Sequence, residues 1–241
     1  MSEPSMIDEA QIEALAVRVR DARRVLFITG AGLSADSGLP TYRGVGGLYN
    51  RECSEEGLPI EVLLSGGMLR ESPATCWRYI SQIEEACRGA SPNAGHHFMA
   101  WLESRRSGVV VLTQNVDGLH RAAGSRELIE IHGTVQELYC TLCDWSEGVR
   151  DYAGIETPPS CPRCGGLVRP NVVLFGEQLP SQALHRLRAE LQRGFDLVFS
   201  VGTTSVFPYI SEPVHHTNGS GGWTVEINPG QSEISHRVQQ R

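Results

Sequence analysis

The sequence has 241 residues, a formal net charge of −7 at pH 7 and 40% hydrophobic residues. A chain of this length can form one large domain, or one domain with a small insert, around a core that needs no covalent cross-links. Its acidic balance gives no general electrostatic attraction to nucleic acid or to anionic lipid. Its apolar runs stay short of the roughly 20 residues that span a bilayer, and its acidic N-terminus differs from a secretory signal, so we expect a cytoplasmic protein.

The predicted elements alternate between helices and short buried strands. Apolar residues at helical spacing predict a helix over Ile12–Arg24. The next run, Val25–Thr29, is short and apolar and stops at Gly30, as expected for a buried strand of a parallel sheet. Similar runs predict strands at Val109–Thr113, Leu128–Ile131, Val172–Phe175, Leu197–Val201 and Trp223–Ile227. Between several of them we expect helices at Pro73–Arg88, Pro92–Ser104 and Pro180–Gln192.

This alternation predicts an α/β fold built on a Rossmann-like, doubly wound parallel sheet. Three stretches fall outside it. Residues 42–67, rich in glycine and polar residues, are predicted to form a long loop, and residues 215–222 a flexible surface connection. Residues 140–166 carry four cysteines among prolines and glycines, which indicates a metal-pinned insert. We therefore expect a Rossmann-like domain at 1–133 and 172–241, with a cofactor loop and helical module near 42–90, and a zinc-binding insert at 134–171.

Four cysteines in two Cys-x-x-Cys pairs predict a zinc site. Cys140 and Cys143 form the first pair, and Cys161 and Cys164 form the second after 17 intervening residues. Each pair lets two thiolates reach one ion from a tight turn, and two such turns complete a tetrahedron. Four thiolates leave no open position, so the zinc would be structural, at one ion per chain. The alternatives are two disulfides or a redox-active pair, which a cytoplasmic location disfavours.

A glycine-rich turn after the first strand predicts a nucleotide site. Gly30 and Gly32 follow the strand directly, where backbone N–H groups can approach a phosphate closely. The pattern departs from the usual dinucleotide fingerprint, because Ala35 stands at the third glycine position. No acidic residue follows in a strand about 20 residues further on, as it would in an ordinary dehydrogenase. These residues therefore indicate an atypical dinucleotide site.

Several motifs, taken together and in chain order, resemble those of the sirtuin (Sir2-type) family. They are residues 30–43 (GAGLSADSGLPTYR), 113–120 (TQNVDGLH), 131–133 (IHG), the two cysteine pairs, 173–177 (VLFGE), 202–205 (GTTS) and 226–228 (EIN). The resemblance runs from about Val25 to Asn228. Within the long loop, residues 44–47 (GVGG) resemble the subgroup that contains bacterial deacylases and the mitochondrial desuccinylase.

The resemblance implies an NAD-dependent protein lysine deacylase. Its substrates would be acylated-lysine proteins or peptides, and its products free lysine, nicotinamide and O-acyl-ADP-ribose. His132 would be the catalytic base. The residues implied at the cofactor are Gly30, Ala31, Gly32, Ser34, Ser37, Thr41, Tyr42, Arg43, Tyr49, Gln114, Asn115, Asp117, Gly202, Thr203, Thr204 and Asn228. The residues implied along the substrate are Val173, Phe175, Gly176 and Glu177.

The chemistry of these residue types suits such roles. Asn115 and Asp117 are short polar side chains just past a strand end, where α/β folds place their ligands. His132 also follows a strand, and a neutral imidazole is a suitable general base near pH 7. The cofactor loop would close over the nicotinamide and exclude water.

Structural alternatives remain for several of these residues. Asp117 could cap the turn before Gly118, and Ser34 and Ser37 could cap helices instead of binding phosphate. A lone histidine at a strand end, such as His132, is more often structural than catalytic, and only its place in the ordered motif set reverses that expectation. His96 and His120 are interpreted as structural side chains with their hydrogen bonds satisfied.

The sequence departs from the common family pattern in the loop after residue 201. Thr204 stands where many relatives carry Ser, and Pro208 arrives one residue earlier after Gly202. The register of this substrate loop is therefore expected to differ from the usual one.

The acyl pocket is predicted to be apolar. Relatives that remove succinyl groups carry Tyr-x-x-Arg on the helix before the Pro-Asn-Ala-Gly-His motif, and the matching positions here are Ile80 and Ile83. They lie three residues apart on one helical face. An apolar pair offers a buried carboxylate no partner, so neutral acyl groups should be preferred over succinyl or malonyl. The alternative is that both isoleucines belong to the core.

Two other functional classes compete with deacylation. A nicotinamide-dependent oxidoreductase would need a hydride partner site and the acidic ribose ligand, which this sequence lacks. A zinc-ribbon nucleic-acid binder would need a basic stripe with exposed aromatic residues. The insert balances Arg150 and Arg163 against Asp144 and Glu147, so we expect no general nucleic-acid binding.

Overall fold

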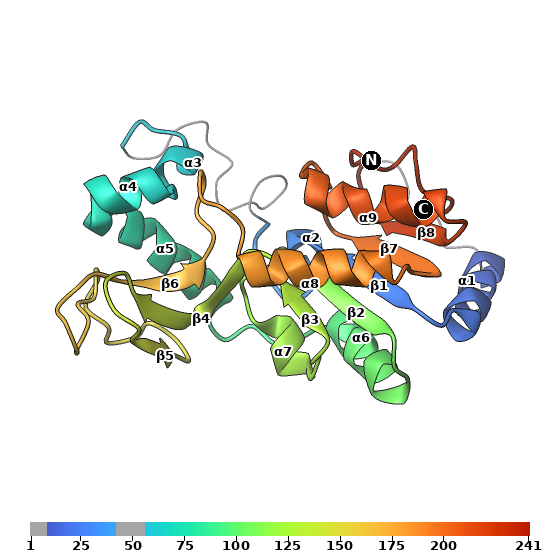
Figure 1. The fold of residues 1–241 in the computed structure, drawn as a ribbon, viewed down its shortest axis with the longest axis horizontal. Helices are drawn as coiled ribbons and strands as arrows, with labels where there is room; N and C mark the ends of the chain where they lie inside the picture. Colours follow the sequence, from blue (N-terminus) through green and yellow to red (C-terminus); the bar gives the residue numbers. More distant parts are fainter. Residues whose placement is uncertain (1–8, 42–55) are drawn as a thin grey trace.

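The computed structural model describes residues 9–41 and 56–241. Its larger sheet has five strands in the order β3-β2-β1-β7-β8, and the pairings are all parallel. The strands are β1 (Val25–Thr29), β2 (Val109–Thr113), β3 (Leu128–Glu130), β7 (Leu197–Val201) and β8 (Trp223–Ile227). The chain order crosses over between β2 and β7 on either side of β1, which is the doubly wound arrangement expected from the sequence (Figure 1).

Helices cover both faces of this sheet because the side chains of each strand alternate between them. On one face, Leu26 and Ile28 pack with residues of α8 (Ser181–Gln192) and α9 (Pro208–Gly219). On the other face, Phe27 packs with α1 (Glu9–Asp21), α2 (Ala31–Ala35) and α6 (Ala94–Arg105). β1, β2 and β7 are buried along their whole length, as their continuous apolar runs predict.

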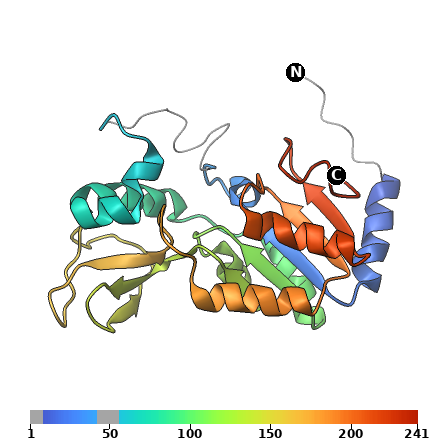
Figure 2. The same cartoon turned by 45° about the horizontal axis from the view of Figure 1, so that its top comes forward.

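A second, smaller lobe lies beyond one end of the large sheet (Figures 1 and 2). It contains the antiparallel sheet β5-β4-β6, formed by β4 (Gly133–Cys140), β5 (Ser146–Gly148) and β6 (Val168–Val172). Three helices pack on it: α3 (Ile60–Leu63), α4 (Gly66–Glu71) and α5 (Pro73–Cys87). Trp77 of α5 is fully buried in the shared core, and its Nε1 donates to the Val168 carbonyl at 3.0 Å. The division into domains at 134–171 stays a prediction.

The structure corrects three predicted elements. The run Val172–Phe175 is not a strand of the parallel sheet: Val172 ends β6 in the antiparallel sheet, and Phe175 makes only an isolated bridge to Ser65. The run is apolar because it packs in the core of the smaller lobe, where Leu174 is buried. The apolar run specified burial, but it did not specify which sheet provides the burial.

The second correction concerns the predicted loop at 42–67. Residues 42–55 lie outside the described residues, but the rest contains α3 and the start of α4. Ser65 caps α4, since its Oγ accepts a hydrogen bond from the Met68 N–H at 3.0 Å. The residue composition of this stretch is loop-like because the helices are very short.

The third correction concerns residues 215–222, predicted as a flexible connection. Most of this stretch is the last part of α9, which ends at Gly219. Ile210, Val214 and Thr217 are buried at spacings of four and three, so the helix is fixed by packing on the large sheet and not by helix propensity. The short α7 (Leu119–Ala123) follows β2.

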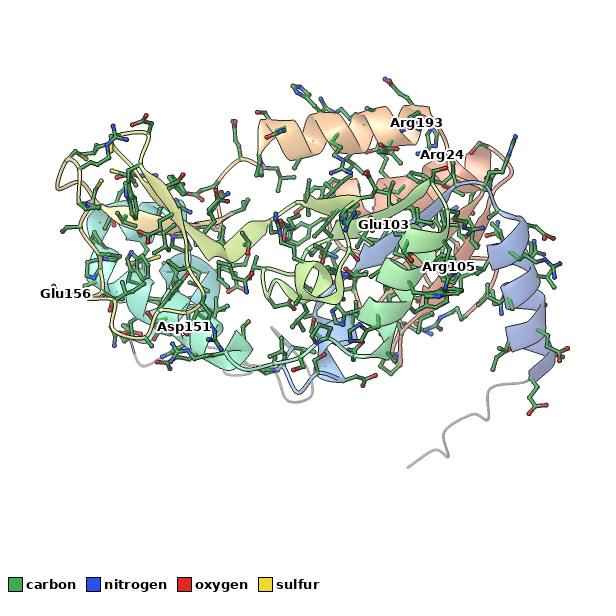
Figure 3. The ribbon with its side chains drawn as sticks, turned by 90° about the horizontal axis from the view of Figure 1, so that it is seen from below. Arg24, Glu103, Arg105, Asp151, Glu156 and Arg193 are labelled. Carbon is green, nitrogen blue, oxygen red and sulfur yellow. The ribbon has the colours of Figure 1, made fainter. Side chains whose placement is uncertain are left out.

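The end of the large sheet at which β1 begins is closed by ion pairs. Arg24, just before β1, and Arg193, just after α8, both pair with Glu190 of α8. Figure 3 labels the two arginines. Asp196 accepts two backbone N–H bonds, from Arg23 and Arg24, both at 2.8 Å. Within the residues that the structure describes, no helix is long and apolar enough to cross a membrane.

Candidate active site and metal centre

Polar side chains gather where β1, β2 and β7 end. Ser34 Oγ donates to Asp117 Oδ2 at 2.7 Å, and Asn115 Nδ2 donates to Ser34 Oγ at 3.1 Å and to the Gly30 carbonyl at 3.0 Å. Ser34 comes from the short helix α2 (Ala31–Ala35) after β1, and the other two come from the turn after β2; β1 and β2 are neighbours in the sheet. The sequence placed all three at one site, and the structure brings them together.

Asp117 also holds its own turn. Its Oδ1 accepts the backbone N–H of Leu119 at 2.9 Å, across Gly118, whose φ is +76°. The turn-capping alternative is therefore confirmed as a contact. Because the second oxygen faces Ser34, the same carboxylate also connects the two turns of the site.

Thr203 forms a second polar group on the β7 side. Gln114 Nε2 donates to Thr203 Oγ1 at 2.8 Å, and Asn228 Nδ2 donates to the Thr203 carbonyl at 2.9 Å. Thr204 contributes its carbonyl, which accepts the Glu233 N–H at 3.0 Å. The residues predicted after β2, β7 and β8 thus meet at one edge of the sheet.

The glycines of this edge are required because two turns touch. A Cβ on Gly30 would lie 2.7 Å from the Gly202 carbonyl oxygen, and one on Gly32 would lie 2.7 Å from the Gly202 Cα. The N–H groups of Gly30 and Gly32 donate to the Val201 and Gly202 carbonyls at 3.0 and 2.9 Å. β7 and its loop therefore use these two N–H groups, and the predicted role of the glycine-rich turn at the cofactor stays a prediction.

Of the remaining residues predicted at the cofactor, the structure describes some and leaves others outside the described ranges. Ala31 begins α2, and Ser34 lies inside it, so Ser34 is not the helix cap. Ser37 Oγ is buried and has no hydrogen-bond partner among the described residues, which suits a residue waiting for a polar ligand. Thr41 is the last described residue before the gap, and Tyr42, Arg43 and Tyr49 lie outside the described residues.

His132 lies directly beside this polar edge. Its Nδ1 is 3.1 Å from the Gln114 carbonyl oxygen, and its Nε2 is 2.8 Å from the Tyr209 hydroxyl. A carbonyl oxygen can only accept, so Nδ1 carries the proton and Nε2 carries the lone pair. Burial lowers the pKa of His132 below its ordinary value of about 6.5, against the opposing effect of the Gln114 hydrogen bond. The imidazole is therefore neutral at pH 7.

The sequence did not indicate that Tyr209 and Phe207 belong to the site. Their rings stack with centroids 5.4 Å apart, and Phe207 meets the His132 ring edge-on at 6.0 Å. Neither residue belongs to a motif with a chemical signature. The one available signal was the early Pro208, which changes the register of the loop that carries both aromatic residues.

The predicted substrate segment follows β6 and touches His132. The Val173 N–H donates to the His132 carbonyl at 2.9 Å, and Phe175 is 38% exposed. Gly176 makes the turn with a φ of +78°. Glu177 faces inward: both of its oxygens bind Arg169, and one also accepts the Leu174 N–H at 2.9 Å. Burial raises the pKa of Glu177, but Arg169 and the Leu174 N–H outweigh it and lower the pKa overall.

Ile80 and Ile83 sit within the smaller lobe. Ile80 is 2% exposed in the core around Trp77, and Ile83 is partly buried against the same core. This packing matches the alternative that both residues are core side chains. Their predicted role in an acyl pocket stays a prediction.

The four predicted metal ligands form one cluster. The Sγ atoms of Cys140, Cys143, Cys161 and Cys164 all lie within 4.8 Å of one another. Cys140 and Cys164 Sγ are 3.4 Å apart, and Cys143 and Cys161 Sγ are 3.6 Å apart. A zinc–sulfur distance of about 2.3 Å gives tetrahedral S···S edges of roughly 3.8 Å, whereas a disulfide bond is about 2.05 Å long. The donor set and its spacing therefore fit a structural Zn²⁺ held by four thiolates.

Comparison with known proteins gives one consistent family. A model of the Sir2 family matches residues 30–208. NAD-dependent protein deacylase 2 of Pseudomonas aeruginosa is 53% identical over 236 residues, which cover 97% of this chain and 92% of that protein. NAD-dependent protein deacylase 1 of Archaeoglobus fulgidus is 38% identical over 226 residues, covering 92% and 88%.

Solved structures show the same fold. A Sir2 homologue in complex with NAD superposes with a TM-score of 0.83 at 34% identity, covering 100% of this chain and 90% of that one. A Sir2 protein with a p53 peptide and NAD+ superposes with a TM-score of 0.80 at 30% identity, covering 95% and 91%.

Proposed function

Because the chain belongs to the Sir2 family and is an NAD-dependent protein lysine deacylase, we propose that His132 is its general base. The observation that carries the proposal is the pair of hydrogen bonds on the His132 ring. Nδ1–H is committed to the Gln114 carbonyl, so the basic lone pair lies on Nε2, on the side of the ring where Tyr209 lies. Family membership sets the oxidoreductase alternative aside.

His132 is suited to take a proton at neutral pH. Burial keeps it neutral, and its fixed orientation means that no rearrangement of the ring precedes proton transfer. Once protonated, the imidazolium keeps its Nδ1–H bond to the Gln114 carbonyl, which stabilises the charge. The base can therefore draw a proton from a ribose hydroxyl and return it later in the cycle.

The polar edge of the sheet is proposed to hold NAD. When bound, NAD supplies a glycosidic bond to a cationic nicotinamide leaving group, which the protein has mainly to position and to shield from water. Ser34, Asn115 and Asp117 are already oriented by one another, so little ordering is left for the ligand to impose. Ser37, whose buried hydroxyl has no partner among the described residues, is proposed as a further contact.

The acylated lysine is proposed to enter between two segments that meet at His132. One is the 173–177 segment with exposed Phe175, and the other is the loop with exposed Val206 and Phe207. His132 touches both, through its carbonyl to Val173 and through its ring to Phe207. An acylated-lysine peptide lying across both segments would place its acyl group beside the base.

The proposal is tested with His132→Ala, NAD and an acetyl-lysine peptide, with products identified by mass. Removal of a general base typically costs about 10²–10⁴-fold in rate. We expect His132→Ala to show that loss with an unchanged melting temperature. The parent protein should release nicotinamide, free lysine peptide and O-acetyl-ADP-ribose. A variant within about threefold of the parent in kcat/KM would exclude His132 as the base.

Two further expectations rest on the sequence alone and stay predictions. They are a cytoplasmic location and the lack of general nucleic-acid binding. The second can be checked by filter binding at two salt concentrations, because binding that depends on phosphate contacts falls steeply with salt.

A further inference from the structure

The hydroxyl of Tyr209 occupies a position that the general-base proposal leaves unexplained. Tyr209 lies in the first turn of α9, immediately after Pro208, and its Oη is 2.8 Å from His132 Nε2. It reaches the site because the loop after β7 turns sharply, with Ser205 at a φ of +55° and 1% exposed. Tyr209 directly follows the early Pro208 noted in the sequence.

The direction of this hydrogen bond follows from the other side of the ring. Since the Gln114 carbonyl requires a proton on Nδ1, a neutral His132 can only accept at Nε2. Tyr209 must therefore donate. Burial raises the pKa of Tyr209 to about 12, so the phenol keeps its proton throughout the physiological range.

Tyr209 is held where it is. Its ring stacks on Phe207, with an interplanar angle of 11°, and packs against the core under α8 and α9. His132 is held in turn by Gln114 and by edge contacts with both aromatic rings, at 6.0 and 5.9 Å. With both side chains fixed, the single basic lone pair of His132 points at the Tyr209 oxygen and not at open space.

We propose that Tyr209 is a second catalytic residue, which relays the proton of the substrate ribose hydroxyl to His132. The Tyr209 oxygen accepts the ribose proton on a free lone pair while its own proton passes to His132 Nε2. One O–H bond of the ribose breaks and one N–H bond forms on His132, and Tyr209 ends as it began, with one proton. The ribose oxygen, freed of its proton, bonds to the acyl carbon. In the return step, His132 Nε2–H passes its proton to the Tyr209 oxygen while the Tyr209 proton passes to the departing lysine nitrogen, so both side chains are restored.

This inference rests on the proposed role of His132, so its test contains both residues. The variant is Tyr209→Phe, which keeps the ring stack and removes only the hydroxyl. The control is Tyr152→Phe, which removes another buried hydroxyl, one that donates to the Val135 carbonyl at 2.8 Å in the smaller lobe. We expect Tyr209→Phe to lower kcat about 10²-fold, within the range for acid–base groups. KM for NAD should stay within about threefold of the parent value, and Tyr152→Phe should keep parent kinetics.

Two readouts separate a relay from a merely structural role. In mixtures of H₂O and D₂O, the parent kcat should depend non-linearly on the deuterium fraction, because two protons move together, and Tyr209→Phe should give a straight line. In the free protein, the ¹⁵N NMR signal of His132 Nε2 should shift in Tyr209→Phe, because its lone pair loses the donor. The Nδ1 signal should stay that of a protonated nitrogen.

The outcomes distinguish the two proposals. A Tyr209→Phe rate within threefold of the parent, or above it, combined with a large loss in His132→Ala, overturns the relay and leaves the general base intact. A linear isotope response in the parent also overturns the relay. Parent-like activity in His132→Ala removes the base itself, and the relay with it, even where the NMR shift shows that the hydrogen bond exists.

Discussion

Asp117 shows how one side chain can hold its own turn and also link it to a neighbouring element. Its two oxygens are used within the protein, one on the Leu119 N–H and one on Ser34 Oγ. The sequence left turn capping and ligand binding as alternatives for Asp117. In the structure, the capping bond to the Leu119 N–H fixes the carboxylate so that its other oxygen faces Ser34. Glu177 differs, because Arg169 and the Leu174 N–H engage it inside the protein and so it braces the substrate segment from behind.

The predicted acyl preference also rests on single residues. Ile80 and Ile83 stand where a succinyl-removing relative would carry Tyr and Arg, and no cation replaces that Arg on the same helical face. An unpaired buried carboxylate costs roughly 3–5 kcal/mol, or about 10²–10³-fold at about 1.4 kcal/mol per decade. We therefore expect acetyl- and butyryl-lysine peptides to exceed a matched succinyl peptide in kcat/KM by a factor of that order. Succinyl as the best substrate would show that these positions do not line the pocket.

At the scale of elements, two buried histidines join β1, α6 and α7. His120 Nε2 lies 2.9 Å from Thr29 Oγ1, and His96 Nδ1 accepts the Asn93 N–H at 3.3 Å, closing the capping box of α6. The rings lie 4.8 Å apart. The expectation of fully satisfied histidines is only half right, because His96 Nε2 and His120 Nδ1 have no partner among the described residues. Their tautomers are complementary, one N–H and one lone pair, so a single water between them would satisfy both.

This pair predicts acid sensitivity of the fold. Burial lowers the pKa of His120 to about 3, against about 6.5 in an unfolded chain, so the unfolded state binds more protons between these values. Stability from this group is complete above about pH 6.5 and falls with pH by about 1.4 kcal/mol per unit until about pH 3. In urea titrations, the unfolding free energies of the parent and of His120→Gln are compared between pH 7.5 and pH 5. We expect the decrease to be about 2 kcal/mol smaller in His120→Gln than in the parent. His215→Gln, on an exposed site of α9, is the control, and equal slopes in the parent and His120→Gln would contradict the assignment.

At the scale of the whole molecule, the cysteine cluster supports more than the insert that carries it. Cys140 and Cys161 belong to one buried core with Trp77 of α5 and with Leu174 of the segment leading to Phe175. A metal bound by the four cysteines would therefore stabilise the core that also positions that segment.

Loss of the metal should accordingly reach the active site. Four thiolates bind one Zn²⁺ with an apparent free energy on the order of 10 kcal/mol. We expect one zinc per chain by elemental analysis, and we expect Cys140→Ser or treatment with a strong chelator to lose zinc, near-ultraviolet circular dichroism of the smaller lobe, and activity together. Cys87→Ser, a free cysteine outside the cluster, should keep all three. Full activity in zinc-free protein would show that the lobe folds without the ion.

The sequence by itself determined the strands of the large sheet and the cysteine cluster, whose signals are local. Val25–Thr29 and the other runs of that sheet predict buried parallel strands, because both faces of such strands are covered. The two Cys-x-x-Cys pairs predict a metal site, because each pair can reach one ion from one turn. The tertiary structure alone decided which elements share a core and which side chains meet. It placed Val172 in the antiparallel sheet, it bonded the N–H groups of Gly30 and Gly32 to the Val201 and Gly202 carbonyls, and it set Tyr209 against His132 across 77 positions of sequence. An apolar run specifies that a segment is buried, and a buried polar side chain specifies that it needs a hydrogen-bond partner. Which segment provides the burial or the partner is decided by packing between segments that are distant in the chain.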